Sequence, residues 1–218
     1  MRIYTKPRII QTRRLKVEVV GLVKTLMTEN LRLEQLVTRD PLTGVLNRRG
    51  FEERYEEMLA GAVRHGRSFT LAMLDIDHFK KINDTHGHKA GDLVLQQIAQ
   101  IIDRSLRADD IFARVGGEEF VIILNETSFD NARVPLERIR KRIGEAVFTA
   151  GPGTIKVTVS MGFASYSPAE GGGSRILTPE QARQAQILKE EKRSGLVEEA
   201  DKQLYRAKNS GRNRIFPD

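Results

Sequence analysis

The segment from Ser68 to Ile76, with the sequence S-F-T-L-A-M-L-D-I, limits the possible folds of this chain more than any other. It is a continuous apolar run of strand length, and such a run is typical of a β-strand buried on both faces. The run therefore predicts an interior strand of a sheet. A polar segment rich in Asp, Asn, Gly and His follows it from Asp77 to Gly91.

The other apolar patterns predict the elements around this strand. Helical spacing of apolar residues is found in four segments: Arg48 to Val63, Asp92 to Leu106, Asn131 to Val147 (with Val134, Ile139, Ile143 and Val147 inward) and Leu196 to Asn209. Further strands are predicted at Ile111 to Val115, Glu118 to Leu124 and, with one solvated face, Thr154 to Ser160. This order of elements predicts an α/β (α+β) sandwich on a mostly antiparallel central sheet.

An amphipathic helix is predicted before this domain, from about Leu15 to Val37, because leucines and valines recur there at three-and-four spacing. Its seam is typical of a short parallel coiled coil, whose apolar positions are buried against another chain. The alternative is a helix packed on its own domain. Asp40-Pro41 ends the helix, because the residue before proline disfavours the helical region. We therefore predict an N-terminal coiled-coil-like helix in residues 1–38 and one domain in residues 39–218, with a surface insertion at about 171–195.

Composition excludes several kinds of site. The chain has no cysteine, so a disulfide, a thiolate metal site and a cysteine nucleophile are impossible, and any metal must bind oxygen or histidine ligands. The formal net charge of +7 suits a nucleic acid, an anionic membrane surface or a nucleoside triphosphate. No apolar run approaches the roughly twenty residues of a membrane span, and the first residues lack a signal-peptide pattern. We therefore expect no membrane segment in this chain and a cytoplasmic location.

Acidic residues stand at the ends of two predicted strands. Asp75 and Asp77 lie where the buried strand stops, and we expect neither to be needed for folding, although capping or turn formation would also explain them. Glu118 and Glu119 follow the Gly116-Gly117 connection between two strands. If this hairpin lies beside the Asp75 strand, three or four carboxylate oxygens meet at one sheet edge and suit Mg²⁺ or Mn²⁺.

The Gly116-Gly117 connection predicts a two-residue hairpin turn of the primed type, which requires positive φ at its central residues. Glycines there would also let a ligand approach the backbone closely. Strict alternation along the strand directs Glu118 and Glu119 to opposite faces. The pattern alone therefore does not place both carboxylates on a metal.

Four separated motifs resemble the GGDEF family of diguanylate cyclases. They are D-P-L-T-G-V-L-N-R-R from Asp40, L-D-I-D-H-F-K-K-I-N-D-T-H-G-H-K-A-G-D from Leu74, G-G-E-E-F from Gly116 and Y-R-A-K-N-S-G-R-N-R from Tyr205. The resemblance covers nearly the whole chain after the N-terminal helix. The third motif has Glu where the family name has Asp, a variant that active members also use. The resemblance implies a polymerase-palm, nucleotide-cyclase-like fold and the condensation of two GTP molecules into cyclic di-GMP and two pyrophosphates.

The resemblance also implies a site for two Mg²⁺ or Mn²⁺ ions. Their ligands would be Asp75, the carbonyl of Ile76, Glu118 and Glu119, and Glu118 would be the base for the 3′-hydroxyl. The resemblance further implies substrate contacts from five residues: Phe79, Lys80, Gly117, Lys208 and Arg212. Without the motifs, the lysines and Arg212 would be interpreted as ordinary solvated side chains.

Asn83 and Asp92 match the family positions that bind the base. A carboxylate accepts hydrogen bonds from guanine N1–H and N2–H, whereas adenine has no donor at N1, so Asp92 favours GTP over ATP. An N-cap role for Asp92 is the competing interpretation, and the two are compatible.

Arg107-Ala108-Asp109-Asp110 precedes the Gly-Gly turn by five residues and fits the family's Arg-x-x-Asp site for inhibitory cyclic di-GMP. The motif is weak alone, and its position gives it weight. Arg138 on the following helix is a candidate for a further contact at this site.

The product joins two nucleotides, so two active sites must face each other, and we expect a homodimer through the N-terminal helix. A catalytically weak domain that binds or senses GTP or cyclic di-GMP is the main alternative, but the intact acids at Asp75, Glu118 and Glu119 argue against it. A basic nucleic-acid-binding protein is a third hypothesis. The chain lacks an aromatic stacking series, so we expect no nucleic-acid partner.

Overall fold

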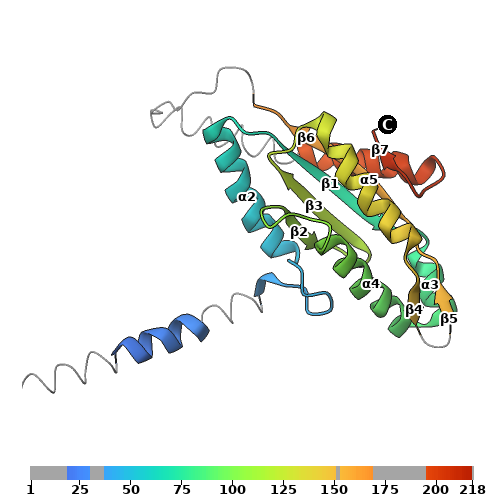
Figure 1. Cartoon of the computed structure of the whole chain (residues 1–218), viewed down its shortest axis with the longest axis horizontal. Helices are drawn as coiled ribbons and strands as arrows, with labels where there is room; N and C mark the ends of the chain where they lie inside the picture. Colours follow the sequence, from blue (N-terminus) through green and yellow to red (C-terminus); the bar gives the residue numbers. More distant parts are fainter. Residues whose placement is uncertain (1–18, 30–36, 151–152, 169–194, 218) are drawn as a thin grey trace, which may run out of the picture. The chain divides into compact units, whose positions relative to one another are not determined.

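The computed structural model describes residues 19–29, 37–150, 153–168 and 195–217 (Figure 1). The chain divides between Thr38 and Arg39 into two units, and the second contains the sheet. In the first unit, residues 19–29 are helical, and Val19, Leu22 and Leu26 are each more than half exposed. The rest of the predicted seam up to Leu36 and nearly all of the predicted insertion at 171–195 lie outside the described residues.

A five-stranded sheet in the order β2-β3-β1-β6-β7 forms the centre of the second unit. β1 (Phe69–Ile76) pairs antiparallel with β3 (Glu119–Asn125) on one side and with β6 (Val159–Tyr166) on the other. β2 (Ile111–Arg114) pairs antiparallel with β3, whereas β7 (Ile215–Phe216) runs parallel to β6. The prediction of an α/β fold with a mostly antiparallel sheet is confirmed.

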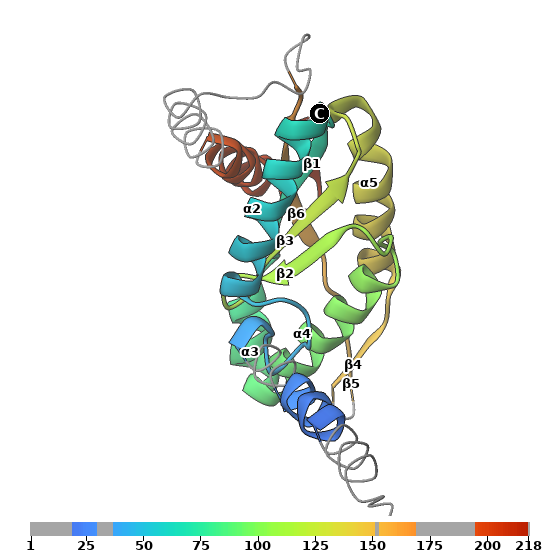
Figure 2. The same cartoon turned by 90° about the vertical axis from the view of Figure 1, so that its left-hand side faces the viewer.

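Helices cover both faces of the sheet, as Figures 1 and 2 show. One apolar cluster joins the sheet to α4 (His88–Asp103) and α5 (Phe129–Glu145). The other joins it to α2 (Arg48–His65) and to the helical residues 195–209. Asn47 caps the start of α2, and its side chain accepts a hydrogen bond from the Gly50 N–H. Gly66, with φ 63°, caps the end of this helix.

All eight residues of β1 are buried, as the apolar run predicted. Successive side chains of a strand point to opposite faces. Leu71 and Met73 pack in the cluster with α2, and Leu74 and Ile76 pack in the cluster with α4 and α5. Asp75 is therefore directed to the face that α2 and residues 195–209 cover.

Two boundaries differ from the sequence prediction. The segment Asp77 to Gly91 contains a helix, α3 (Phe79–His86), and the next helix begins at His88 rather than at Asp92. α4 opens with the polar residues His88 and Lys89, so its amphipathic pattern begins late, and the short helix α3 has only two buried residues, Phe79 and Ile82. Asp92 is consequently not an N-cap, because that position is held by Gly87.

The predicted strand Thr154 to Ser160 is wrong. β5 (Gly153–Ile155) pairs with β4 (Phe148–Ala150) in a separate two-stranded sheet, and the central strand β6 starts only at Val159. β6 contains Gly162, and a Cβ there would clash with the backbone of Leu204 and Ala200. The position of this strand therefore depends on close backbone contact with a helix. The alternation of apolar and polar residues in the sequence does not indicate such a contact.

The inward assignment of Val134 and Val147 is also wrong, since they are 72% and 67% exposed. The buried stripe of α5 consists of Ala132, Leu136, Ile139 and Ile143. Val134 lies two positions from this stripe on the opposite side of the helix, and Val147 follows the last helical residue. Within the described residues, no helix is long and apolar enough to cross a membrane.

Candidate active site

The hairpin that carries Glu118 and Glu119 lies directly beside the Asp75 strand. Asp75 is the register partner of Glu119 across β1 and β3. The Ile76 N–H donates to the Glu118 carbonyl at 3.4 Å, which continues the pairing past the end of the strands. Antiparallel pairing thus brings acidic residues far apart in the sequence to one sheet edge.

The turn of this hairpin differs from the predicted two-residue primed turn. Arg114 pairs with Phe120, so residues 115–118 form the connection, and neither Gly116 nor Gly117 has a positive φ. A Cβ on Gly116 would clash with the carboxylate of Glu119, whereas the corresponding space at Gly117 is open. The Glu119 side chain therefore folds against Gly116, and a Cβ at this position would force the flexible carboxylate end to shift.

Asp75 is the most buried of the three acids. Its Oδ2 lies 2.8 Å from Lys208 Nζ, and the side chains are 8% and 32% exposed, respectively. Burial raises the pKa of Asp75, the Lys208 ammonium opposes the rise, and the charges of Glu118 and Glu119 add to it. The charges of Glu118 and Glu119 thus lie close enough to act on Asp75.

These acids fit a hard cation in their chemistry. Carboxylate and carbonyl oxygens are the ligands that Mg²⁺ and Mn²⁺ prefer. Among the described residues, however, no three acidic or histidine side chains form a ready metal cluster. Lys208 contacts Asp75 Oδ2 instead, so a cation bound at this oxygen would compete with the ammonium.

Asp77 has a structural role, which corrects the expectation that neither acid is needed for folding. Its carboxylate accepts hydrogen bonds from the hydroxyls of Thr158 and Ser160, both at 2.7 Å, and from the Asn213 N–H at 3.0 Å. It is only 4% exposed. Asp77 thus joins the end of β1 to the start of β6 and to the segment before β7.

Two arginines hold the backbone of the connection at residues 115–118. Arg114 donates to the Gly117 carbonyl from Nε at 3.1 Å and from Nη2 at 2.7 Å, while its Nη1 contacts both Asp40 carboxylate oxygens. Arg48 donates from Nε and Nη2 to the Val115 carbonyl. Burial alone would raise the pKa of Asp40, but hydrogen bonds from Thr43 and Arg114 outweigh it, and the net shift is downward.

Sequence reasoning missed the role of these arginines. Asp40 and Arg48 belong to the first quoted motif and Arg114 precedes the glycines by one residue, but no local pattern connects these residues. Together they fix the carbonyls of Val115 and Gly117, on either side of Gly116, and so brace the connection that leads into Glu118 and Glu119.

Asn83 on α3 presents a buried acceptor. Its Oδ1 has no hydrogen-bond partner among the described residues. A Cβ at Gly91 would clash with this oxygen, so the glycine makes room for it, and the exposed Asp92 follows at once on α4. An unpartnered buried acceptor costs about 1–3 kcal/mol, which a ligand N–H would recover.

The remaining substrate-contact candidates fall in different places. Phe79 is buried in the core with α4, so only its backbone is available, and Lys80 is exposed in the first turn of α3. The first N–H groups of a helix lack intrahelical partners and suit anions. Arg212 is not on the helix with Lys208, because helical residues end at 209 and Arg212 has φ 62° in the following turn.

The Arg-x-x-Asp segment forms a closed turn. Asp110 accepts from the Arg107 N–H at 2.9 Å and from the Asn125 N–H at 3.0 Å. The Arg107 guanidinium is exposed and makes no hydrogen bond or ion pair with the described residues. Arg138 donates to the carbonyl of Ser105 at 3.0 Å, which places it beside the same loop.

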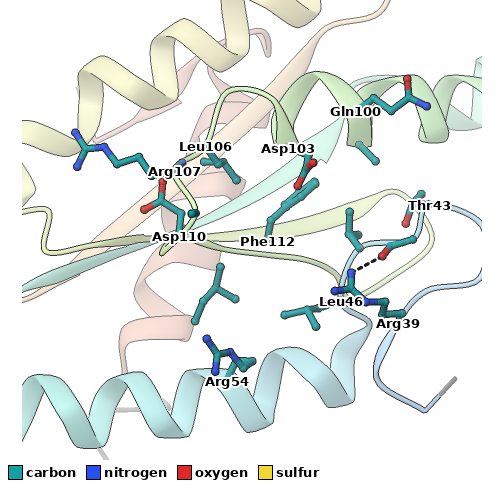
Figure 3. A pocket seen from close by; sticks show the side chains of 15 residues that line it. Arg39, Thr43, Leu46, Arg54, Gln100, Asp103, Leu106, Arg107, Asp110 and Phe112 are labelled. Carbon is teal, nitrogen blue, oxygen red and sulfur yellow. Dashed lines mark hydrogen bonds between the residues drawn. The ribbon is translucent and has the colours of Figure 1, made fainter. Parts of the chain in front are cut away.

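A cavity of about 740 Å³ adjoins this turn, between α2, α4 and the edge strand β2. Phe112 and Leu46 line its apolar part, and Arg39 and Arg54 bring positive charge to it. Figure 3 shows Arg107 extending away from these two arginines, and Arg39 donates to the Gly44 carbonyl at 2.7 Å. The Arg-x-x-Asp turn therefore lies at one end of this cavity.

Comparison with known proteins relates the chain to one family. The family model described as "Diguanylate cyclase, GGDEF domain" matches residues 37–195. The chain is 40% identical over 181 residues to diguanylate cyclase DgcP of Pseudomonas aeruginosa, covering 83% of this chain and 24% of that protein. It is 35% identical over 202 residues to diguanylate cyclase A of Treponema denticola, covering 91% of this chain and 49% of that protein. It thus spans about a quarter to a half of the length of these relatives.

Solved structures with a similar fold extend over nearly the whole chain. The coiled coil and GGDEF domain of DgcB from Caulobacter crescentus, in complex with c-di-GMP, superimposes with a TM-score of 0.75 at 29% identity. The match covers 94% of this chain and 97% of that chain.

Proposed function

The chain belongs to the GGDEF family of diguanylate cyclases, and we propose that it condenses two GTP molecules into cyclic di-GMP and two pyrophosphates. One observation carries this proposal: the register pair Asp75 and Glu119, next to Glu118, at the edge reached by Lys208. A domain that only binds nucleotide has no need for three acidic residues together at one sheet edge.

The Asp75, Glu118 and Glu119 carboxylates and the Ile76 carbonyl would hold two Mg²⁺ or Mn²⁺ ions. When bound, these ions would neutralise the triphosphate and polarise the α-phosphate. Glu118 accepts the proton of the 3′-hydroxyl of one GTP. At the same time, the 3′-oxygen of that GTP forms a bond to the α-phosphorus of the other GTP. The bond from that phosphorus to pyrophosphate breaks in the same step. Arg114 and Arg48 keep Glu118 in place through the backbone carbonyls of the turn.

The triphosphate contacts would come from the N-terminal turn of α3 with Lys80, from the open backbone at Gly117, and from Lys208 and Arg212. Guanine would be held by Asn83 and Asp92, since the orphaned Asn83 Oδ1 can accept from a base N–H. Asp92→Ser should weaken the preference for GTP over ATP by on the order of 2 kcal/mol. Direct competition between the two nucleotides measures this, and an unchanged preference would remove Asp92 from the base site.

We also propose that residues 1–38 dimerise the catalytic domain in residues 39–218, and that the protein acts in the cytoplasm. The exposed Val19, Leu22 and Leu26 support this dimer, as does the coiled coil of the similar DgcB structure. Removing residues 1–38 should leave GTP binding intact but make specific activity fall on dilution, because the second domain loses its high effective concentration. Equal activity of both proteins at low concentration would refute this role of the helix.

Product inhibition is proposed at Arg107, Asp110 and Arg138. The unengaged Arg107 guanidinium supports this, since arginine binds phosphate through two charge-assisted hydrogen bonds. Arg107→Ala should make more product than wild type at similar initial rates. If added cyclic di-GMP inhibits both proteins equally, the inhibitory site lies elsewhere.

Incubation of the purified chain with GTP and Mg²⁺, followed by nucleotide chromatography, tests the proposed activity directly. Glu118→Gln should abolish cyclic di-GMP formation, because it removes the base and one ionic ligand at nearly constant shape. Glu53→Gln is the matched control, since Glu53 is exposed on α2 and pairs with the exposed Arg49. Full turnover in Glu118→Gln would show that the wrong carboxylate was assigned.

A further inference from the structure

The Lys208 ammonium lies where the proposed function requires a metal ion. Its Nζ is 2.8 Å from Asp75 Oδ2, within a pair whose carboxylate is almost fully buried. Among the described residues, Lys208 is the one cation paired with Asp75. A buried carboxylate needs such a partner, because an uncompensated charge in the interior is strongly unfavourable.

The backbone that carries Lys208 is fixed, but its side chain is not. Ala200, Leu204 and Ala207 of the same helical segment are buried, and the backbone at Leu204 packs directly against Gly162 of β6. The Lys208 side chain is about one third exposed and has a flexible four-carbon stem. The ammonium can therefore leave Asp75 without any movement of the helix.

We propose that Lys208 is an internal counter-ion that occupies Asp75 in the substrate-free protein, weakens metal binding there, and is exchanged for metal more readily when nucleotide is bound. This inference rests on the metal site of the proposed function. An ammonium and a divalent cation on the same buried carboxylate repel each other at short range. Metal binding at Asp75 therefore competes with the Lys208 ammonium.

The displaced ammonium needs a new anion, and the triphosphate supplies it. Metal without nucleotide breaks the Lys208–Asp75 pair and leaves the ammonium without a partner, whereas metal with nucleotide exchanges one partner for another. Metal and GTP therefore bind cooperatively, and the coupling passes through one side chain. A Lys208 that only contacts phosphate would leave the affinity for metal alone unchanged.

Mn²⁺ titration followed by electron paramagnetic resonance tests this exchange, first without nucleotide and then with a GTP analogue whose α and β phosphorus atoms are joined by methylene. The measurement is made at pH 8, so that protons compete less for Asp75. Lys208→Met keeps the length of the side chain and removes its charge. Lys208→Arg keeps the charge. Lys202→Met is the matched control, since Lys202 lies on the same helical segment and contacts Glu199.

Without nucleotide, Lys208→Met should bind Mn²⁺ about tenfold more tightly than wild type, the value of one charge-assisted hydrogen bond. With the analogue, Lys208→Met should bind Mn²⁺ less tightly than wild type does. Without nucleotide, Lys208→Arg and Lys202→Met should bind Mn²⁺ as wild type does. Equal or weaker Mn²⁺ binding by Lys208→Met would overturn the exchange while leaving the metal site intact. Absence of Mn²⁺ binding in all proteins, with and without the analogue, would overturn the assigned carboxylates and this inference with them.

Discussion

Asp77→Ala should destabilise the domain, whereas Asp75→Asn should abolish synthesis at nearly unchanged stability, although the two residues stand on one strand end. Asp77 accepts three hydrogen bonds and is 4% exposed. Each bond contributes about 1–1.5 kcal/mol, so removing all three should lower the free energy of unfolding by about 3–4 kcal/mol. For a domain of this size, the melting temperature should fall by roughly 10 °C.

Asp75→Asn should leave the stability of the domain nearly unchanged. It removes a buried charge, which is favourable, and the ion pair with Lys208, which is unfavourable, so the free energy of unfolding should change by less than about 1 kcal/mol. Burial raises the pKa of Asp75, so the folded domain gains stability when this carboxyl is protonated. This gain is complete below the ordinary pKa of 3.8 and is lost as the pH rises through the raised pKa. Asp75→Asn should remove this pH dependence.

Urea unfolding followed by circular dichroism gives both free energies, and chromatography of the GTP reaction gives the activity. Asp77→Asn is the matched control, since an amide oxygen can still accept from Thr158 and Asn213 while its NH₂ donates to Ser160. It should therefore cost much less than Asp77→Ala. The reasoning fails if Asp77→Ala unfolds at the wild-type urea concentration, or if Asp75→Asn loses as much stability as Asp77→Ala.

Three further changes test other contacts. Gly162→Ala should lower the melting temperature markedly, because its Cβ overlaps the Leu204 backbone and overpacking costs about 1–3 kcal/mol or more; a wild-type melting temperature would disprove this close packing. Asp40→Asn should destabilise the domain at pH 7 but much less at pH 3. The lowered pKa of Asp40 stabilises the folded domain above the ordinary pKa of 3.8, and this stability is lost as the pH falls through the pKa of the folded state. Thermal melts at both pH values measure the difference. Arg114→Lys should reduce kcat about tenfold with little change in KM. The reason is that lysine cannot bind Asp40 and the Gly117 carbonyl together. An unchanged kcat would show that the turn needs no such support.

The sequence alone determined the elements whose signal is local. The apolar run before Asp77 predicted β1, because a strand buried on both faces cannot contain solvated residues. Helical spacing predicted every end of α2 and α5 to within two residues. The motifs around Asp75 and Gly116 indicated the family, since they consist of contiguous residues whose identities can be read directly.

Only the tertiary structure decided what the individual acids and arginines do. Asp77 and Asn213 are 136 residues apart, and Asp40 and Arg114 are 74 apart, so no window of the sequence contains either pair. The same holds for Lys208 and Asp75, whose contact depends on a helix seated on Gly162. A pattern of apolar residues fixes which face of an element is buried, but it does not fix which polar groups of distant elements meet there, because that depends on the register and seating of the packed elements.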